Sequence, residues 1–114
     1  MNTVNSVLTQ GPAIQAISMI SGDTMIIPLY FSIDEVPIDF TDYQFFAVLE
    51  DQDSSIDLDV AIENQTLSKG YVTVTISSTI SASLNGRYSW KVWWLDGDLN
   101  KRTVIQGGCD IRGS

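Results

Sequence analysis

Few residues of this sequence could do chemistry, and the most suggestive are the carboxylates between Asp51 and Asp59. The run reads Asp-Gln-Asp-Ser-Ser-Ile-Asp-Leu-Asp, and alternate carboxylates can converge on a hard cation such as Ca²⁺. However, Ile56 stands where an EF-hand loop needs glycine, and Ile62 stands where it needs a bidentate glutamate. We therefore expect a solvated acidic loop, with no metal and no cofactor.

Candidate nucleophiles are equally scarce. Histidine is absent, so neither a Ser-His-Asp triad nor a Cys-His pair can form. Cys109 is the single cysteine, which excludes an internal disulfide and favours a small buried hydrophobe over a reactive thiol. Glycine-rich phosphate loops are also missing, because Gly107-Gly108 is expected to lead into a strand and not into a helix. We predict no catalytic residue and no enzyme activity.

The charge balance narrows the range of partners. Lysine and arginine number 6 against 14 acidic residues, a net charge of −8, so the phosphates of a nucleic acid would be repelled. The apolar runs are far shorter than the ~20 residues of a membrane helix. We expect neither nucleic acid nor membrane as a partner. The opening MNTVNSVLTQ has no basic or apolar signal region, which predicts assembly in a cytoplasm.

Apolar and polar residues alternate by two along most of the chain, which predicts an all-β fold. A chain of 114 residues is long enough for one core and one domain. The predicted strands cover residues 14–20, 24–31, 43–50, 58–63, 71–76, 87–95 and 102–106, with a short last strand at 109–111. Residues 77–85 are expected to hold one helical turn. Turn residues between the strands favour an antiparallel immunoglobulin-like β-sandwich of about seven strands.

Glycine and proline refine this picture. Pro28 lacks a backbone donor, so its strand is expected at a sheet edge or a bulge. Asp96-Gly97 predicts a hairpin turn with positive φ at Gly97, and Gly107-Gly108 predicts a β-bulge. The segment from Leu84 to Tyr88, which includes Gly86, resembles the tyrosine corner of Greek-key sandwiches, in which the hydroxyl bonds to upstream backbone. These residues are predicted to be structural.

All three tryptophans lie in the stretch YSWKVWWLDGD, residues 88–98. Alternation along a strand places its side chains on two faces. The predicted core face holds Tyr88, Trp90, Val92 and Trp94. Trp93 and Leu95 lie on the other face, where two interpretations stay open. Either the protein's own hairpin buries them, or they anchor an interface, where tryptophan is enriched.

Several of these motifs follow one another in a characteristic order. They are Gly22-Asp23-Thr24 before an apolar strand, Asp39 with Tyr43, Gly86 with Tyr88, and Gly107 after Arg-Thr-Val-Ile-Gln. In this order, over residues 22–111, the sequence resembles the small immunoglobulin-like domains of tailed-phage virion proteins. The N-terminal domains of siphophage upper baseplate proteins, and related tail, fibre and adaptor modules, are similar in this way.

The resemblance implies a non-enzymatic structural component of a virion, acting as a baseplate, tail or fibre adaptor or as a capsid-decorating subunit. Its partners would be other virion proteins and further copies of itself in a homo-oligomer. Residues 1–12 would form an N-terminal arm that lies on a neighbour, and residues 13–114 a single β-sandwich domain. The interface candidates are Trp93, Leu95, Pro12 and Pro28, the last through strand addition at a sheet edge.

A second function, from a different class, is a carbohydrate-binding module. Trp93 and Tyr71 would be its stacking platforms, and the acidic loop would accept hydrogen bonds from a cell-surface glycan. Sugar sites use several coplanar exposed aromatic rings with polar neighbours, whereas most other aromatic residues here are predicted on core faces. A glycan partner is therefore not favoured.

Overall fold

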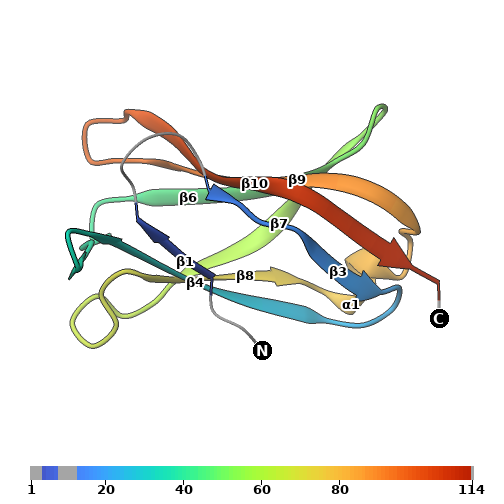
Figure 1. Cartoon of the computed structure of the whole chain (residues 1–114), viewed down its shortest axis with the longest axis horizontal. Coiled ribbons are helices and arrows are strands. Elements are labelled where there is room, and N and C mark those ends of the chain that lie inside the picture. Colours follow the sequence, from blue (N-terminus) through green and yellow to red (C-terminus); the bar gives the residue numbers. More distant parts are fainter. Residues whose placement is uncertain (1–3, 8–12, 114) are drawn as a thin grey trace.

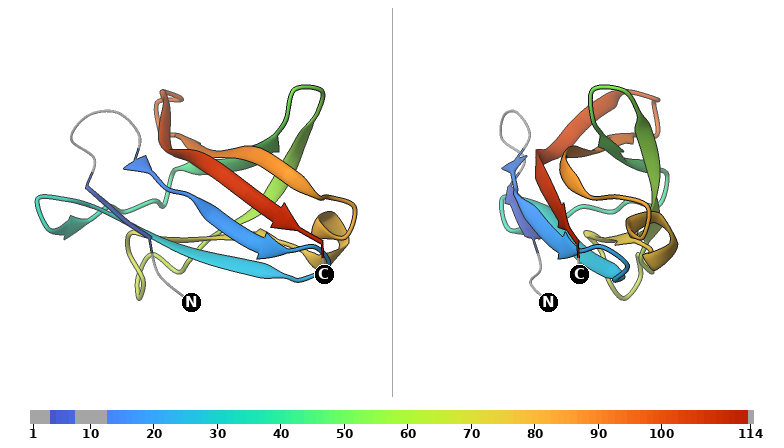
Figure 2. Two further views of the ribbon diagram at one scale, coloured as in Figure 1. Left: turned by 45° about the vertical axis from the view of Figure 1, so that its right-hand side comes forward. Right: turned by 90° about the vertical axis from the view of Figure 1, so that its right-hand side faces the viewer.

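The computed structural model describes residues 4–7 and 13–113 and shows two β-sheets packed face to face (Figures 1 and 2). The strands are β1 (Val4–Val7), β2 (Ala13–Ile14), β3 (Ile17–Ile20), β4 (Met25–Ile33), β5 (Val36–Pro37), β6 (Gln44–Glu50), β7 (Ser55–Ile62), β8 (Tyr71–Ile76), β9 (Gly86–Leu95) and β10 (Lys101–Arg112). The predicted helical turn is α1 (Ser78–Ser81), and it begins where the Ser77 hydroxyl accepts the Ile80 N–H.

The strands follow the order β1-β4-β8-β7-β6-β9-β10-β2, while β3 also pairs with β10 and β5 with β4. Strand β7 belongs to both sheets, since its residues 55–58 pair with β6 and its residues 59–62 pair with β8. The pairs from β4 through to β10 are antiparallel. The predicted all-β, immunoglobulin-like sandwich is confirmed.

The N-terminal strands are parallel to their partners, which the sequence did not predict. β1 pairs with residues 29–32 of β4, and β2 and β3 pair with β10. Within the predicted N-terminal arm, Val4–Val7 is thus a strand on the sheet of its own chain. Residues 1–3 and 8–12, Pro12 included, lie outside the described residues.

The predicted connector at residues 34–42 also contains a strand. β4 and β5 form a hairpin in which Ser32 is opposite Pro37. Its two turn residues, Asp34 and Glu35, have φ angles of 51° and 67°, the left-handed conformation that a two-residue hairpin turn requires. The predicted first strand is divided into β2 and β3, and the two predicted last strands, 102–106 and 109–111, are joined in β10. With the unpredicted β1 and β5, the described part of the chain has ten strands.

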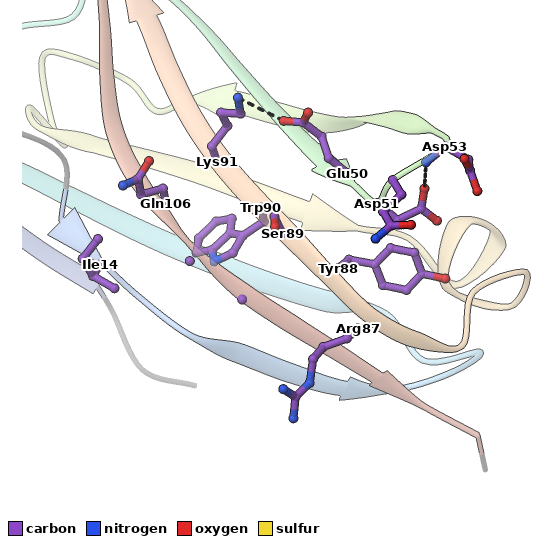
Figure 3. A pocket seen from close by; sticks show the side chains of 13 residues that line it. Ile14, Glu50, Asp51, Asp53, Arg87, Tyr88, Ser89, Trp90, Lys91 and Gln106 are labelled. Atoms are coloured by element: carbon purple, nitrogen blue, oxygen red, sulfur yellow. Dashed lines mark hydrogen bonds and ion pairs between the residues drawn. The ribbon is translucent and has the colours of Figure 1, made fainter.

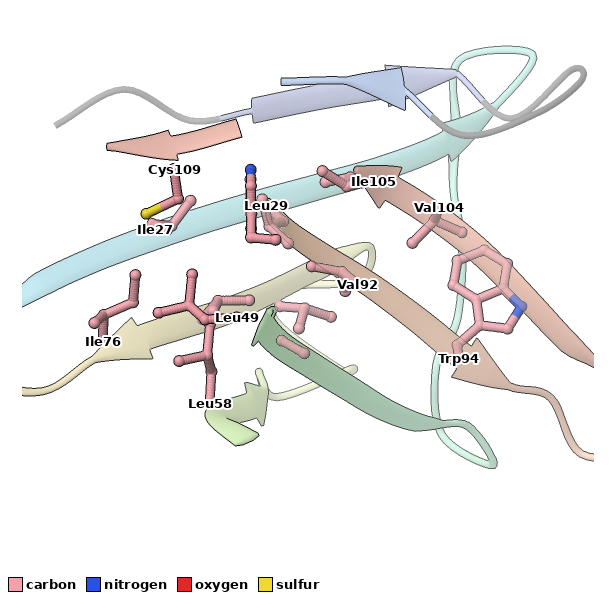
Figure 4. Packing of buried hydrophobic residues seen from close by; sticks show 14 of the residues in the cluster. Ile27, Leu29, Leu49, Leu58, Ile76, Val92, Trp94, Val104, Ile105 and Cys109 are labelled. Atoms are coloured by element: carbon pink, nitrogen blue, oxygen red, sulfur yellow. The ribbon is translucent and has the colours of Figure 1, made fainter. Parts of the chain in front are cut away.

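One hydrophobic core fills the space between the sheets (Figure 4). The predicted core face of β9 is confirmed for Trp90, Val92 and Trp94, which are buried, whereas Tyr88 is only partly buried. At one end of the core, edge-to-face contacts join Phe31, Phe40, Tyr43, Phe45 and Trp94. The predicted tyrosine corner is also present, because the Tyr88 hydroxyl accepts the Asn85 N–H at 3.3 Å.

A hydrogen bond from the core reaches the segment between β2 and β3, in addition to the backbone pairing of these strands with β10. The buried Trp90 indole donates from Nε1 to the carbonyl oxygen of Gln15 at 2.7 Å. Gln15 lies between β2 and β3. Both strands pair with β10 at the same difference in residue number, so Gln15 lies opposite Gly107. A Cβ atom at residue 107 would lie 2.0 Å from that carbonyl oxygen. Glycine is therefore required there because another backbone occupies the space of a side chain.

The bulge and the positive φ angle that were predicted at glycines both occur at other residues. The bulge expected at Gly107-Gly108 lies instead at Val104, between Thr103 and Ile105, and β10 runs without a break through both glycines. The positive φ expected at Gly97 occurs at Leu99, with a value of 64°. In both places the prediction used the presence of a glycine, whereas the backbone conformation depends on the strand pairing around it.

Replacing Gly107 by alanine tests the close approach at Gln15. We expect Gly107→Ala to lower the free energy of unfolding by about 2 kcal/mol or more, because the Gln15 backbone must move and leave a buried indole N–H unpaired. Urea denaturation measures the difference.

Gly108→Ala is the matched control. A Cβ at residue 108 would meet no atom within 4 Å, so the change should stay within about 0.5 kcal/mol. Equal losses in the two variants would contradict the proposed constraint.

Candidate functional site

The outer face of the sheet formed by β6, β9 and β10 carries two of the interface candidates, Trp93 and Leu95. We call this surface the β9 face. It comprises Gln44, Phe46, Val48 and Glu50 of β6, Ser89, Lys91, Trp93 and Leu95 of β9, and Lys101, Thr103, Gln106 and Gly108 of β10. Because cross-strand neighbours share a face, these side chains form one continuous surface opposite the core.

Trp93 is half-buried between two neighbours of its own chain. The Phe46 ring lies 5.6 Å from the Trp93 ring, centroid to centroid, with their planes 18° apart. The Lys101 Nζ lies 5.1 Å from the centroid of the Trp93 ring, within range of a cation–π interaction. Since Phe46 and Lys101 come from the strands on either side of β9, the chain covers Trp93 in part and leaves it accessible in part.

Phe46 is the residue that the sequence interpretation missed. It is 37% exposed, and it lies on the side of β6 away from Phe45, which packs against the core. Alternation within YQFFAVLE would have placed these two residues on opposite faces. The pairing with Trp93 could not be found in this way, because it depends on which strand lies beside β6 and in which register.

A groove of about 300 Å³ lies beside Phe46, over β6 and β7. Its lining includes Trp93 and the exposed carboxylates Asp57 and Asp59. The last pair between β6 and β7 joins Ala47 to Leu58, after which β7 crosses to the other sheet. The groove is the space that β7 leaves at this crossing.

A wider and more open hollow of about 1070 Å³ occupies the other end of the β9 face (Figure 3). Its lining includes Ser89 and Gly108, two residues too small to fill it, and the 74% exposed Ile14. An ion pair joins the Lys91 Nζ to Glu50 Oε1 at 3.1 Å. The hollow therefore combines an apolar edge with charged groups, among them the Lys91–Glu50 ion pair.

The start of the acidic run, residues 51–53, borders this hollow. The run was predicted as a loop, but only residues 51–54 form one, because β7 begins at Ser55. The Asp51 carboxylate accepts the backbone N–H groups of Asp53 and Ser54, both at 2.8 Å. These bonds hold the pKa of Asp51 below its usual value, with the Asp53 N–H as the largest cause. Within residues 4–7 and 13–113, no group of three potential ligands could hold a metal ion.

The remaining candidates lie away from Trp93. Pro28 is opposite Thr73 of β8, and the pairing of β4 with β1 begins only at the next residue, Leu29. Among the described strands, residue 28 thus has a partner on one side only. Tyr71 packs against Tyr30 on the other sheet, with ring centroids 4.8 Å apart, so the structure does not bring together the two suggested sugar platforms.

Cys109 is fully buried in the core. Burial raises the pKa of its thiol from 9.0 to about 11, and the nearby Asp110 carboxylate adds to this shift. The thiolate is the reactive form of cysteine, so this side chain is a packing residue. In the described segments of the chain, no helix has the length and apolar character needed to cross a membrane.

The comparisons with known proteins rest on structure. No protein-family model matches the sequence, and no curated protein is recognisably similar to it in sequence. The N-terminal domain of phage TP901-1 ORF48 has a TM-score of 0.60 and 14% sequence identity, over 96% of this chain and 94% of that one. The two share a fold.

Murine CRIg is a second similar structure, with a TM-score of 0.46 and 12% identity over 87% of this chain and 92% of that one. The resemblance to small domains of phage proteins, first drawn from the order of short motifs, is confirmed at the level of the fold by the phage domain.

The burial of Cys109 predicts how stability depends on alkaline pH. The folded thiol, with a pKa near 11, keeps its proton longer than the unfolded thiol, whose pKa is 9.0. The contribution to stability is therefore complete below pH 9 and is lost as the pH rises toward about 11. Urea denaturation at a series of pH values measures this loss.

Cys109→Ala should lack this part of the alkaline loss, although it is less stable at neutral pH because of the atom removed from the core. The wild-type thiol should also resist a thiol reagent near neutral pH until the chain is unfolded. Rapid labelling of the folded protein would contradict this prediction.

Proposed function

We propose that this protein is a non-enzymatic structural component of a tailed-phage virion. It would act through protein–protein contacts, as a baseplate, tail or fibre adaptor or as a capsid-decorating subunit. The observation that carries the proposal is the fold shared with a domain of a phage protein over 96% of this chain. Its partners are other virion proteins and further copies of the chain.

The β9 face is the contact surface that we favour. Stable interfaces combine apolar anchors at the centre with a polar rim, and tryptophan is enriched among residues that contribute most to binding. The β9 face offers the exposed Phe46, the half-buried Trp93 and Leu95, and the exposed Ile14 at its edge. Ion pairs and carboxylates surround them.

Sheet edges give a second means of assembly. Among the described strands, β1 pairs only with β4, and β3 pairs only with β10. On its other side each strand has no strand partner among the described residues, and a free edge can accept a strand of a neighbouring chain. A homo-oligomer built in this way would use the N-terminal segment and the edge near Pro28.

A carbohydrate-binding function has less support. Sugars stack on an open aromatic face, and Trp93 is flanked by Phe46 on one side and Lys101 on the other. Tyr71 lies on the other sheet. Glycan binding is therefore an outcome to be tested and not the function that we favour.

Native mass spectrometry of the purified chain, together with co-sedimentation with assembled phage particles, tests the proposed function. We expect a defined oligomer, or a subunit that joins particles, and we expect Trp93→Ala to weaken the assembly because it removes a central anchor. Leu67→Ala is the matched control, since Leu67 is 84% exposed in the loop between β7 and β8.

Deletion of residues 1–12 tests the N-terminal contact, and circular dichroism establishes whether the shortened chain still folds. A wild-type chain that stays monomeric, never joins particles and binds sugars on a glycan array would overturn the proposed function in favour of the carbohydrate-binding module.

A further inference from the structure

The groove beside Phe46 is bordered by a short free strand edge. Strand β6 pairs with β9 along its whole length, from Gln44 to Glu50, but it pairs with β7 only from Ala47 onward. Figure 1 shows β7 leaving this sheet to join β8. In the described part of the chain, residues 44–46 therefore have no strand partner on the β7 side. Free backbone groups of this kind can pair with an added strand.

The groove is acidic and has no cation of its own. Asp57 and Asp59 line it, are exposed, and point to the same side of β7 because they are two residues apart. Neither forms an ion pair with a described lysine or arginine. On the same sheet, by contrast, Glu50 and Asp110 are both paired with basic side chains. The two carboxylates are thus available to a positive charge from outside.

Phe46 and Trp93 form the aromatic wall of the groove, and Trp93 already contacts one cation, the Lys101 ammonium. Lys101, Trp93 and Phe46 lie in a row across β10, β9 and β6, with the Lys101 ammonium against the Trp93 ring. Phe46 ends this row, and the groove lies beyond it toward β7. A basic side chain laid in the groove would have aromatic carbon on one side and carboxylate on the other.

We propose that this groove is a docking site for an extended segment of a partner virion protein that carries a lysine or an arginine. The aliphatic part of that side chain packs on Phe46 and Trp93, and its charged end reaches Asp57 and Asp59. The backbone of the segment adds to the free edge at residues 44–46. The inference rests on the proposed function, because it assigns the chemistry of one partner contact on the β9 face.

A polypeptide fits these features better than a free metal ion. The groove has only two carboxylates among its lining residues, and an aromatic wall gives a metal ion no ligand. A long basic side chain, however, uses the aromatic wall, the carboxylates and the strand edge together. Charge complementarity on a chain of net charge −8 also favours a basic partner.

A nuclear magnetic resonance titration with synthetic peptides tests the proposal. The probes are short strand-forming peptides that differ only at the central residue, which is arginine, lysine, norleucine or glutamate. We expect the arginine and lysine peptides to shift the amides of residues 44–47 and 57–60 and the indole N–H of Trp93. The norleucine and glutamate peptides should shift them little, because they bring no positive charge.

Variants show whether the two carboxylates are responsible. Asp57→Asn with Asp59→Asn should weaken binding of the arginine peptide about tenfold, and Phe46→Ala should weaken it as well. Asp53→Asn with Asp98→Asn removes the same charge elsewhere and should leave the affinity unchanged. High salt should weaken binding to the wild type far more than to the Asp57→Asn, Asp59→Asn variant.

The inference would be overturned by norleucine or glutamate peptides that bind as well as the basic ones, by an equal loss in the two double variants, or by the absence of shifts at millimolar peptide. A chain that assembles in native mass spectrometry but ignores the basic peptides overturns this inference alone. A chain that binds them but neither assembles nor joins particles contradicts the proposed function.

Discussion

The hydrogen bond from the Trp90 indole to the Gln15 carbonyl ties the segment between β2 and β3 to the core, in addition to the backbone pairing of both strands with β10. It places one polar bond inside the core, where an unpaired indole N–H would cost roughly 1–3 kcal/mol. It lies where the chain passes between β2 and β3, both of which pair with β10 at the same residue offset. Because Gly107 has no side chain, the Gln15 backbone can lie against β9 and β10, which are far from it in the sequence.

The second organising feature is the crossing of β7 between the sheets. It closes the core on one side without a separate edge strand, and it leaves the groove and the free edge of β6 next to Phe46. The outer surface therefore varies along its length. One end has small residues and the Lys91–Glu50 ion pair. The other has stacked aromatic rings beside two carboxylates that form no ion pair with a described lysine or arginine. Both regions follow from strand pairing, with no long loop involved.

The long strands β4, β6, β7, β8, β9 and β10 could be predicted because alternation by two is a local pattern, and the core face of β9 followed from it directly. The parallel N-terminal strands could not be predicted, because pairing between Ile17 and Cys109 joins residues far apart in the chain and leaves no local signature. Gly107 was predicted to form a β-bulge, but glycine is needed there because the Gln15 backbone lies against it. Gln15 is far from Gly107 in the sequence, so no local pattern indicates this contact. Trp93 could be identified as a candidate from its face of the strand alone. The positions of Phe46 and the two carboxylates beside Trp93 could not be predicted, because they depend on strand register and on the crossing of β7.

The crossing of β7 also bears on how the domain responds to mechanical load. Because one strand is hydrogen-bonded to both sheets, a force that pulls the sheets apart acts on the backbone ladders of β7 as well as on packed side chains. Several hydrogen bonds must then break together before the layers separate. A sandwich joined in this way can transmit tension from one face to the other while keeping its shape.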